Sequence, residues 1–312
     1  MPRLIDDLRA ARSVVMPHFV APWQVGRWDD YARNVMGLVR NPDLPVLLID
    51  NVAAYYFTGT DQEYWSLEKD FPNVAPPYPQ FWMEHKMPRE IVSKTEGVTD
   101  VTKWTPNGRV GMLFTACDPA QSKIEGDPPP GTKWIVWMEL FVDYGSASNG
   151  IQGPQGATFL CVDAEGKVLD VPWMQSFAPQ HLSHLMKHCM TWFHPGLLAV
   201  SFLHCKNVTL EDHAVDAPLA KKWRARHGFN PTPYRTLVIE PLKAILRHEG
   251  RAHEHGLARA MHICRGHFAD YTQGRGLFGK LHGKFWMPST VRGTKGKSAP
   301  PREIEVRIPP SL

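Results

Sequence analysis

The sequence predicts an α+β protein, with an antiparallel sheet and flanking helices that lead into a smaller basic C-terminal lobe. Three observations predict this class. Apolar residues recur at helical spacing near the N-terminus, β-branched and aromatic segments follow one another between turn signals, and positive charge gathers in the last third. A chain of 312 residues suits one large domain or two ordinary ones. We expect a sheet domain over residues 1–215 and a basic His/Arg/Gly-rich lobe over residues 216–312.

Two helices are predicted before the first strand. Residues 3–17 place Leu4, Ile5 and Leu8 on one apolar stripe. Residues 25–41 repeat the pattern, and Pro42 ends that helix because the residue before a proline avoids the helical conformation.

The strands of the sheet are predicted between residues 44 and 173. The candidate segments are residues 44–50, 52–59, 80–88, 108–118 and 133–145, and a hairpin over residues 157–173. Asp50-Asn51 offers a turn, so we expect residues 52–59 to be the antiparallel partner of the first strand.

A histidine-bearing helix is predicted after residue 178. Pro195 must kink this helix or divide it in two. His181, His184 and His188 fall on one helix face, a spacing that could bind a metal ion. No Asp or Glu lies nearby to complete a site, so we expect solvent-facing histidines, no metal and no cofactor.

Charge is divided unequally along the chain. Residues 221–312 hold 18 Lys and Arg against 6 Asp and Glu, a net charge of +12, whereas the preceding residues hold 17 and 25, a net charge of −8. The polar, basic residues 218–235 are predicted to be a linker or the entry to the second lobe. Such asymmetry favours an anionic partner for the lobe, most commonly nucleic acid. The alternative is a basic face that docks on the protein's own acidic half.

The lobe contains the segment HICRGHFADYTQGRGLFGKLHGKFW (262–286), in which cations and aromatic rings alternate on a glycine-rich backbone. Cations neutralise phosphates and aromatic rings stack on unpaired bases, so single-stranded nucleic acid, RNA in particular, is favoured over duplex DNA. The candidate nucleic-acid-binding residues are Arg275, Lys280, Phe285, Trp286, Arg292, Lys295 and Lys297. In the alternative interpretation, Phe278, Phe285 and Trp286 fill a small core beneath the loop.

The same segment could cleave RNA without a metal ion. RNA supplies its own 2′-hydroxyl nucleophile, imidazoles can act as base and acid, and a cation can stabilise the crowded phosphate. The candidate catalytic residues are His262, Arg265, His267, Tyr271, His282 and Lys284. Residues 259–271 read as one strand with His262 and His267 on opposite faces, unless a bulge at Gly266 turns one of them round. The P-loop, nucleophile-elbow, zincin and deaminase motifs are all missing.

The box HICRGHF (262–268) and the following segment LFGKLHGKFWMPSTVRG (277–293) resemble the C-terminal signature of a loosely defined group of uncharacterised proteins from phages and integrated mobile elements. The upstream segment FLHCKNV (202–208) is similar in character to that group. The resemblance covers the last third of the chain. It implies a phage or mobile-element context and assigns no activity and no functional residue.

Three functions remain open from the sequence. The first is a nucleic-acid-binding protein that acts as a metal-independent ribonuclease of toxin or phage-defence type. The second is a non-catalytic interaction protein whose acidic N-terminal domain binds a partner protein. The third is a metal-dependent nuclease or phosphodiesterase.

No apolar run is long enough for a membrane span, and Asp6 and Asp7 interrupt any signal peptide, so we expect no membrane association and a cytoplasmic protein. The five scattered cysteines predict reduced thiols.

Overall fold

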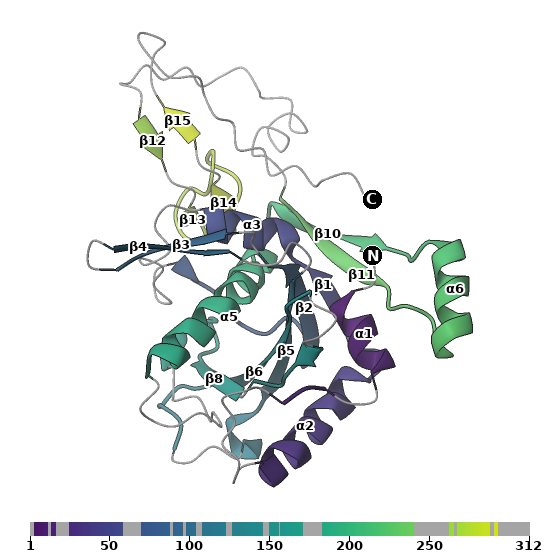
Figure 1. The fold of residues 1–312 in the computed structure, drawn as a ribbon. Helices are drawn as coiled ribbons and strands as arrows, with labels where there is room; N and C mark the ends of the chain where they lie inside the picture. Colours follow the sequence, from purple (N-terminus) through teal and green to yellow (C-terminus); the bar gives the residue numbers. More distant parts are fainter. Residues whose placement is uncertain are drawn as a thin grey trace.

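The computed structural model describes residues 3–11, 14–16, 25–58, 70–87, 90–95, 98–103, 108–122, 127–145, 150–155, 157–170, 183–239, 262–264, 267–287 and 290–292. Its helices are α1 (Leu4–Ala10), α2 (Val25–Val39), α3 (Asp50–Thr58), α5 (Ser183–Leu203) and α6 (Ala217–His227), with a short 3-10 helix at Pro119–Gln121. Figure 1 shows their arrangement around one large sheet.

The large sheet has nine strands. They are β1 (Val46–Leu48), β2 (Gln80–Lys86), β5 (Arg109–Cys117), β6 (Trp134–Asp143), β7 (Ile151–Gln152), β8 (Ala157–Val162), β9 (Val168–Asp170), β10 (Val208–His213) and β11 (Tyr234–Ile239). The order is β10-β11-β1-β2-β5-β6-β8-β9, and β7 pairs with β6. The predicted α+β class is confirmed. The prediction of an antiparallel sheet is wrong at β1, which runs parallel to both β11 and β2, so the sheet is mixed.

Residues 52–59 do not form the predicted antiparallel strand, because residues 50–58 are helix α3. Val52, Ala53 and Tyr56 are buried, and this spacing places them on one face of the helix. The backbone N–H of Ala53 donates to the carbonyl of Ile49. A helix at this point makes the crossover that β1 needs to run parallel to β2, which a tight turn cannot do.

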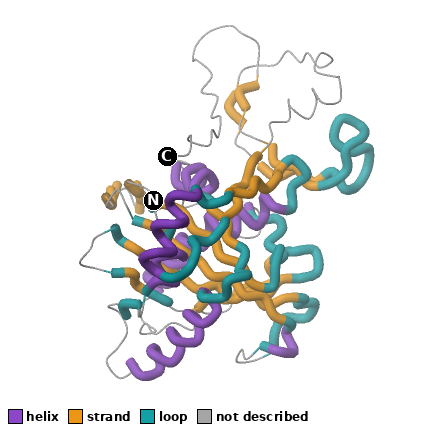
Figure 2. Tube along the Cα trace, turned by 90° about the vertical axis from the view of Figure 1, so that its right-hand side faces the viewer, coloured by secondary structure: helices purple, strands orange, loops and turns teal. Residues whose placement is uncertain are grey.

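Helices cover both faces of the sheet (Figures 1 and 2). On one face, α3 and α5 pack against inward residues of the central strands, including Phe81, Met112 and Phe114. On the other face, α1 and α2 pack against Trp82, Leu113 and other residues of the same strands. Consecutive strand residues thus face opposite layers, as the pleat of a sheet buried on both sides requires.

Pro195 neither ends α5 nor divides it, since the helix runs from Ser183 to Leu203. Gly196 follows the proline at a close approach to β5. A Cβ atom at Gly196 would lie 2.8 Å from the ring carbon Cζ of Phe114, so only glycine lets the helix pack this near the strand.

The expected boundary at residue 215 falls inside the sheet. The segment predicted as a linker forms α6 and the beginning of β11, and β11 pairs with β10 on one side and β1 on the other. The chain therefore returns to the sheet after residue 216 before it enters the C-terminal hairpins.

Candidate nucleic-acid interface

Four further strands pair in two short segments at one end of the molecule. They are β12 (His262–Cys264), β13 (His267–Asp270), β14 (Lys284–Met287) and β15 (Thr290–Arg292). A separate hairpin consists of β3 (Glu90–Thr95) and β4 (Val98–Lys103). In Figure 1, β12 and β15 extend away from the main body beyond β13 and β14.

The pairs β12–β15 and β13–β14 keep one register. His262 pairs with Arg292, and His267 pairs with Met287, with two residues between the paired segments on each strand. The bulge at Gly266 that could turn one histidine round would fall on residues 265 and 266, which lie outside the described residues. His267 is exposed.

The base of β14 is joined to the segment 202–208, which the sequence also singled out. The Asn207 side chain donates from Nδ2 to the carbonyl of Trp286 at 2.9 Å, and its Oδ1 accepts from the Trp286 N–H at 2.9 Å. The backbone N–H of Lys206 donates to the carbonyl of Lys284 at 2.8 Å. The two motifs therefore form a single structural unit although they are about 80 residues apart.

Phe285 and Trp286 are buried in this unit, with 2% and 5% of their surface exposed. The Trp286 ring lies 4.8 Å from Phe202, 4.7 Å from Phe268 and 5.5 Å from Tyr55, between ring centroids. The Trp286 ring cannot stack on a base without unpacking this cluster, and the Phe285 ring, whose centroid lies 6.1 Å from that of Tyr271, is covered to the same degree. The alternative of a small core thus fits both residues, and we remove them from the interface.

The backbone of Tyr271 meets that of Gly283 at the loop end of the hairpin, while the register places the Tyr271 side chain on the Phe285 face and the Lys284 side chain on the Asp270 face. The Tyr271 N–H donates to the carbonyl of Gly283, the residue between His282 and Lys284. Gly283 has a φ of 137°, and a Cβ atom there would lie 2.8 Å from Cγ of Lys206. Glycine is required at this position, and the stem of Lys206 packs across it.

The positive charge of Lys284 influences the protonation of two neighbouring side chains, Asp270 and Cys205. Lys284 pairs with Asp270 across the strands, and Asp270 accepts from the N–H and the hydroxyl of Thr272. The Thr272 hydrogen bonds, together with Lys284, lower the pKa of Asp270. Burial raises the pKa of the Cys205 thiol to about 12, with Lys284 acting in the opposite sense. A protonated thiol is a poor nucleophile, so Cys205 is not a catalytic candidate.

His204 is a residue of this unit that the sequence did not single out. Its Nε2 lies 2.9 Å from the carbonyl oxygen of Ala75. Burial lowers the pKa of His204, the hydrogen bond to Ala75 raises it, and the ammonium of Lys284 lowers it. His204 is therefore tied to the protein rather than directed at a ligand, and only the FLHCKNV segment (202–208), to which it belongs, signalled its region.

The loop that joins β13 to β14 carries exposed cations. Arg275, Lys280 and His282 are exposed, and Asp270 is the one acidic residue between 267 and 287. Arg292 lies in β15, opposite His262, and the structure does not describe the side chain of either residue. Arg265, Lys295 and Lys297 lie outside the described residues.

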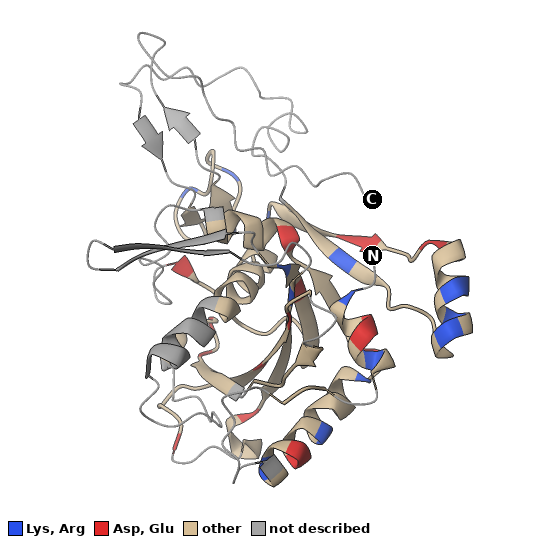
Figure 3. Cartoon of the chain, viewed as in Figure 1, with Lys and Arg blue, Asp and Glu red and all other residues tan. Residues whose placement is uncertain are grey.

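A second basic surface lies on α6; the sequence analysis noted the basic residues there but predicted a linker or the entry to the second lobe rather than a helix. Lys221, Lys222, Arg224 and Arg226 are exposed, and the helix contains no acidic residue. Figure 3 shows their positive charge on a helix at the side of the sheet. Glu211 and Asp212 on β10 are exposed, and Asp212 forms an ion pair with Arg235 at 2.7 Å.

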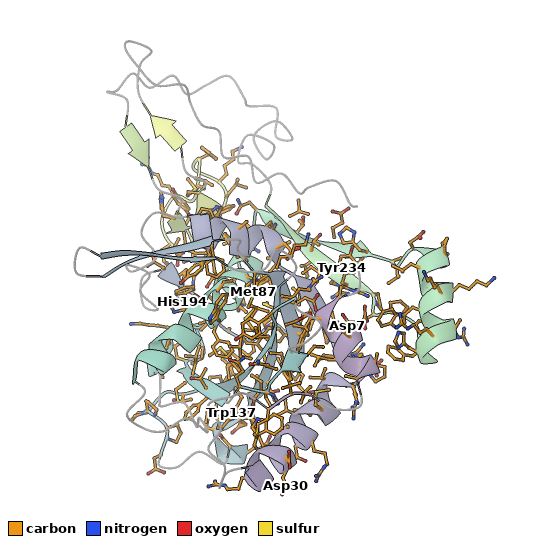
Figure 4. The ribbon with its side chains drawn as sticks, viewed as in Figure 1. Asp7, Asp30, Met87, Trp137, His194 and Tyr234 are labelled. Carbon is orange, nitrogen blue, oxygen red and sulfur yellow. The ribbon has the colours of Figure 1, made fainter. Side chains whose placement is uncertain are left out.

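Two other histidines are held inside the fold. His85 is fully buried, and its Nδ1 lies 2.8 Å from the Lys86 carbonyl oxygen. His194, labelled in Figure 4, has its Nδ1 2.9 Å from the hydroxyl of Tyr56. Burial lowers the pKa of each to about 4, so both are neutral at pH 7.

Among the described residues, no group of three His, Cys, Asp or Glu side chains could hold a metal ion. No helix in that part of the chain has the length and apolar character to cross a membrane.

Comparison of the chain with protein-family models, with curated proteins and with solved structures gives no match.

Proposed function

We propose that this protein binds single-stranded nucleic acid, with RNA favoured, through the β13–β14 hairpin and its loop, and that it does so in the cytoplasm. One observation carries the proposal: the cations Arg275 and Lys280 are exposed on this loop together with the imidazole of His282, and Asp270 is the one acidic residue between 267 and 287. Binding of nucleic-acid phosphates to such a group of cations is favourable because it releases condensed counterions. The stem of Lys206 and the half-buried Lys284 extend the positive region toward the body of the protein.

A salt titration of the full-length chain tests the proposal. We expect a fluorescein-labelled 12-nucleotide RNA to bind at low ionic strength, with affinity falling about 100-fold between 50 and 200 mM salt if about five phosphates are contacted. Absence of binding at 50 mM salt would overturn the proposal and favour the interaction-protein alternative. In that alternative, the acidic N-terminal region binds a partner protein.

Ribonuclease activity is a second candidate, favoured by the exposed His282 next to the Tyr271–Gly283 backbone hydrogen bond at the loop end. His282 supplies an imidazole, which can act with the phenol of Tyr271 on one face of the hairpin or with the Lys284 cation on the other. His267 lies three strand positions from Asp270, roughly 10 Å away along β13 at the spacing of strand residues, and His282 lies beyond the opposite end. The geometry therefore favours His282 over His267 as the imidazole of this site.

Cleavage is tested in EDTA with full-length protein and a uniform RNA substrate. The candidate predicts 2′,3′-cyclic phosphate ends, resistance of DNA, and a loss of rate of about 10²–10⁴-fold in His282→Ala. The same loss is not expected in His267→Ala, which serves as the matched histidine control. Intact RNA after prolonged incubation with folded wild-type protein, with or without divalent metal, would eliminate the activity and leave the binding function.

A further inference from the structure

Phe278 differs from the other two aromatic residues of the segment. Its side chain is 40% exposed, whereas those of Phe285 and Trp286 are buried. Among the described residues, Phe278 is the one aromatic side chain in the group of exposed large apolar residues, which otherwise comprises Val15, Leu38, Leu169 and Leu219. An exposed ring within a cluster of cations calls for an explanation other than core packing.

The backbone at Phe278 is in the left-handed region. Its φ is 55°, the one positive φ at a residue other than glycine in the described part of the chain. Glycine occupies this region without steric cost, whereas a phenylalanine there is strained by its Cβ atom. Glycines lie close to this position in the sequence, and a large ring at the strained residue points to a use of the ring.

The loop around Phe278 is held in one conformation. Leu277 and Leu281 exchange backbone hydrogen bonds of 2.7 and 3.0 Å, and the Lys280 N–H donates to the Leu277 carbonyl at 3.2 Å. A Cβ atom at Gly276 would lie 2.9 Å from the carbonyl oxygen of Leu281, so the turn closes tightly at its base. The Leu277 side chain is 5% exposed and anchors the turn in the protein. The turn thus fixes the backbone of Phe278 before any ligand arrives.

We propose that Phe278 is a stacking platform for an unpaired base in the proposed nucleic-acid interface. The ring stands two positions from Lys280 and three from Arg275, both exposed, so a phosphate bound by either cation brings its neighbouring base within reach. Stacking on an aromatic ring tolerates any base, which agrees with recognition of single strands without sequence preference. A base in a duplex is already stacked on its neighbours and cannot use such a ring.

The inference rests on the proposed function, and the probes are chosen to separate the two. Full-length protein is titrated with a single-stranded 12-nucleotide RNA, with the same backbone carrying abasic sites, and with inorganic polyphosphate. We expect Phe278→Ala to bind the base-bearing RNA about 10- to 100-fold more weakly than wild type, the range expected for loss of one stacked base. Its affinity for the abasic strand and for polyphosphate is expected to equal that of wild type. Phe278→Trp is expected to retain affinity for the base-bearing strand.

Thermal unfolding separates stacking from a structural role of the ring. Phe278→Gly relieves the strained φ, so its melting temperature is expected to equal or exceed that of wild type while the affinity falls. A melting temperature several degrees lower in both Phe278→Gly and Phe278→Ala would overturn the inference in favour of packing. Equal affinity of wild type and Phe278→Ala for base-bearing RNA would overturn stacking but not binding. Failure of wild type to bind any of the three probes would overturn the proposed function as well.

Discussion

The side chain of Asn207 pairs with the backbone of Trp286 as another strand would, giving one hydrogen bond to its carbonyl and accepting one from its N–H, each 2.9 Å long. Asn207 has 1% of its surface exposed. This amide supplies the partner that the edge of β14 lacks at Trp286, and it joins the basic hairpin to the end of α5. The Asn207 side chain therefore acts together with the Lys206–Lys284 backbone bond and the packing of Trp286 to hold the proposed interface on the body of the protein.

Asn207→Ala is predicted to destabilise the protein by about 2–4 kcal/mol, because it leaves the N–H and carbonyl of Trp286 buried without their partners. The measurement is the free energy of unfolding in urea. Asn230→Ala, at an exposed position after α6, is the matched control and is expected to change stability by less than about 0.5 kcal/mol. Equal stability of the two variants would contradict the structural role of Asn207.

The burial of Phe285 and Trp286 predicts a loss of stability when either ring is removed. Trp286→Ala and Phe285→Ala are each expected to cost about 3–5 kcal/mol, as for other large aromatic residues truncated in a core. The melting temperature should fall by several degrees, with affinity for RNA measured on the folded fraction. An unchanged melting temperature together with lost affinity would return the two rings to the interface.

The pair formed by Tyr31 and Glu139 predicts a pH-dependent stability. Burial raises the pKa of Glu139 to about 8, opposed by the hydrogen bond from the Tyr31 hydroxyl. The unfolded chain releases this proton near pH 4.5, so between about pH 4.5 and 8 the native state binds more protons than the unfolded state. Stability is therefore expected to fall as pH rises through this window, by up to about 1 kcal/mol per pH unit. Glu139→Gln, which stays neutral, should show a flatter profile in urea titrations at pH 5 and pH 8. A steeper profile in Glu139→Gln would contradict the assignment.

Strands β1, β2, β5, β6, β8 and β9 could be predicted from local pattern because each has its own sequence signal, whereas β7 and β10 were not predicted. The segments around Phe81, Phe114 and Met138 are rich in β-branched and aromatic residues, and all three are strands. The nine-residue segment of α3 could not be assigned in this way, since a short apolar run satisfies a buried strand and a buried helix equally well. The parallel pairing of β1 depends on β11, whose residues lie nearly 190 positions later, and no local pattern records such a contact.

The candidate site was predictable in composition and not in geometry. The density of His, Arg, Lys and Gly residues directed attention to the hairpin. Which rings face solvent depends on Phe202, Phe268 and Asn207, and Asn207 is 79 positions from the tryptophan it binds. Alternation along a strand distinguishes two faces and does not say which face the rest of the protein covers. Phe278 was assigned no separate role, because its exposure and its positive φ are visible only in the folded loop.

The final prediction concerns where on the surface the nucleic acid binds. Lys280→Glu and Arg275→Glu each reverse a charge at an exposed position of the loop. Arg27→Glu makes the same change in net charge at an exposed position of α2, and this helix lies at the opposite end of the molecule in Figure 1. The substitution places an acidic residue in the first turn of the helix, where it is tolerated.

If binding depends on the loop, the two loop variants should lose affinity for single-stranded RNA while Arg27→Glu stays close to wild type. The dependence of log affinity on log salt should also become shallower by about 0.7 for each phosphate contact that is lost. Equal losses in all three variants would mean that net charge, rather than the hairpin, attracts the RNA. The readout is fluorescence anisotropy of the labelled strand at four or more salt concentrations, with the melting temperature of each variant measured alongside so that unfolding is not counted as lost affinity.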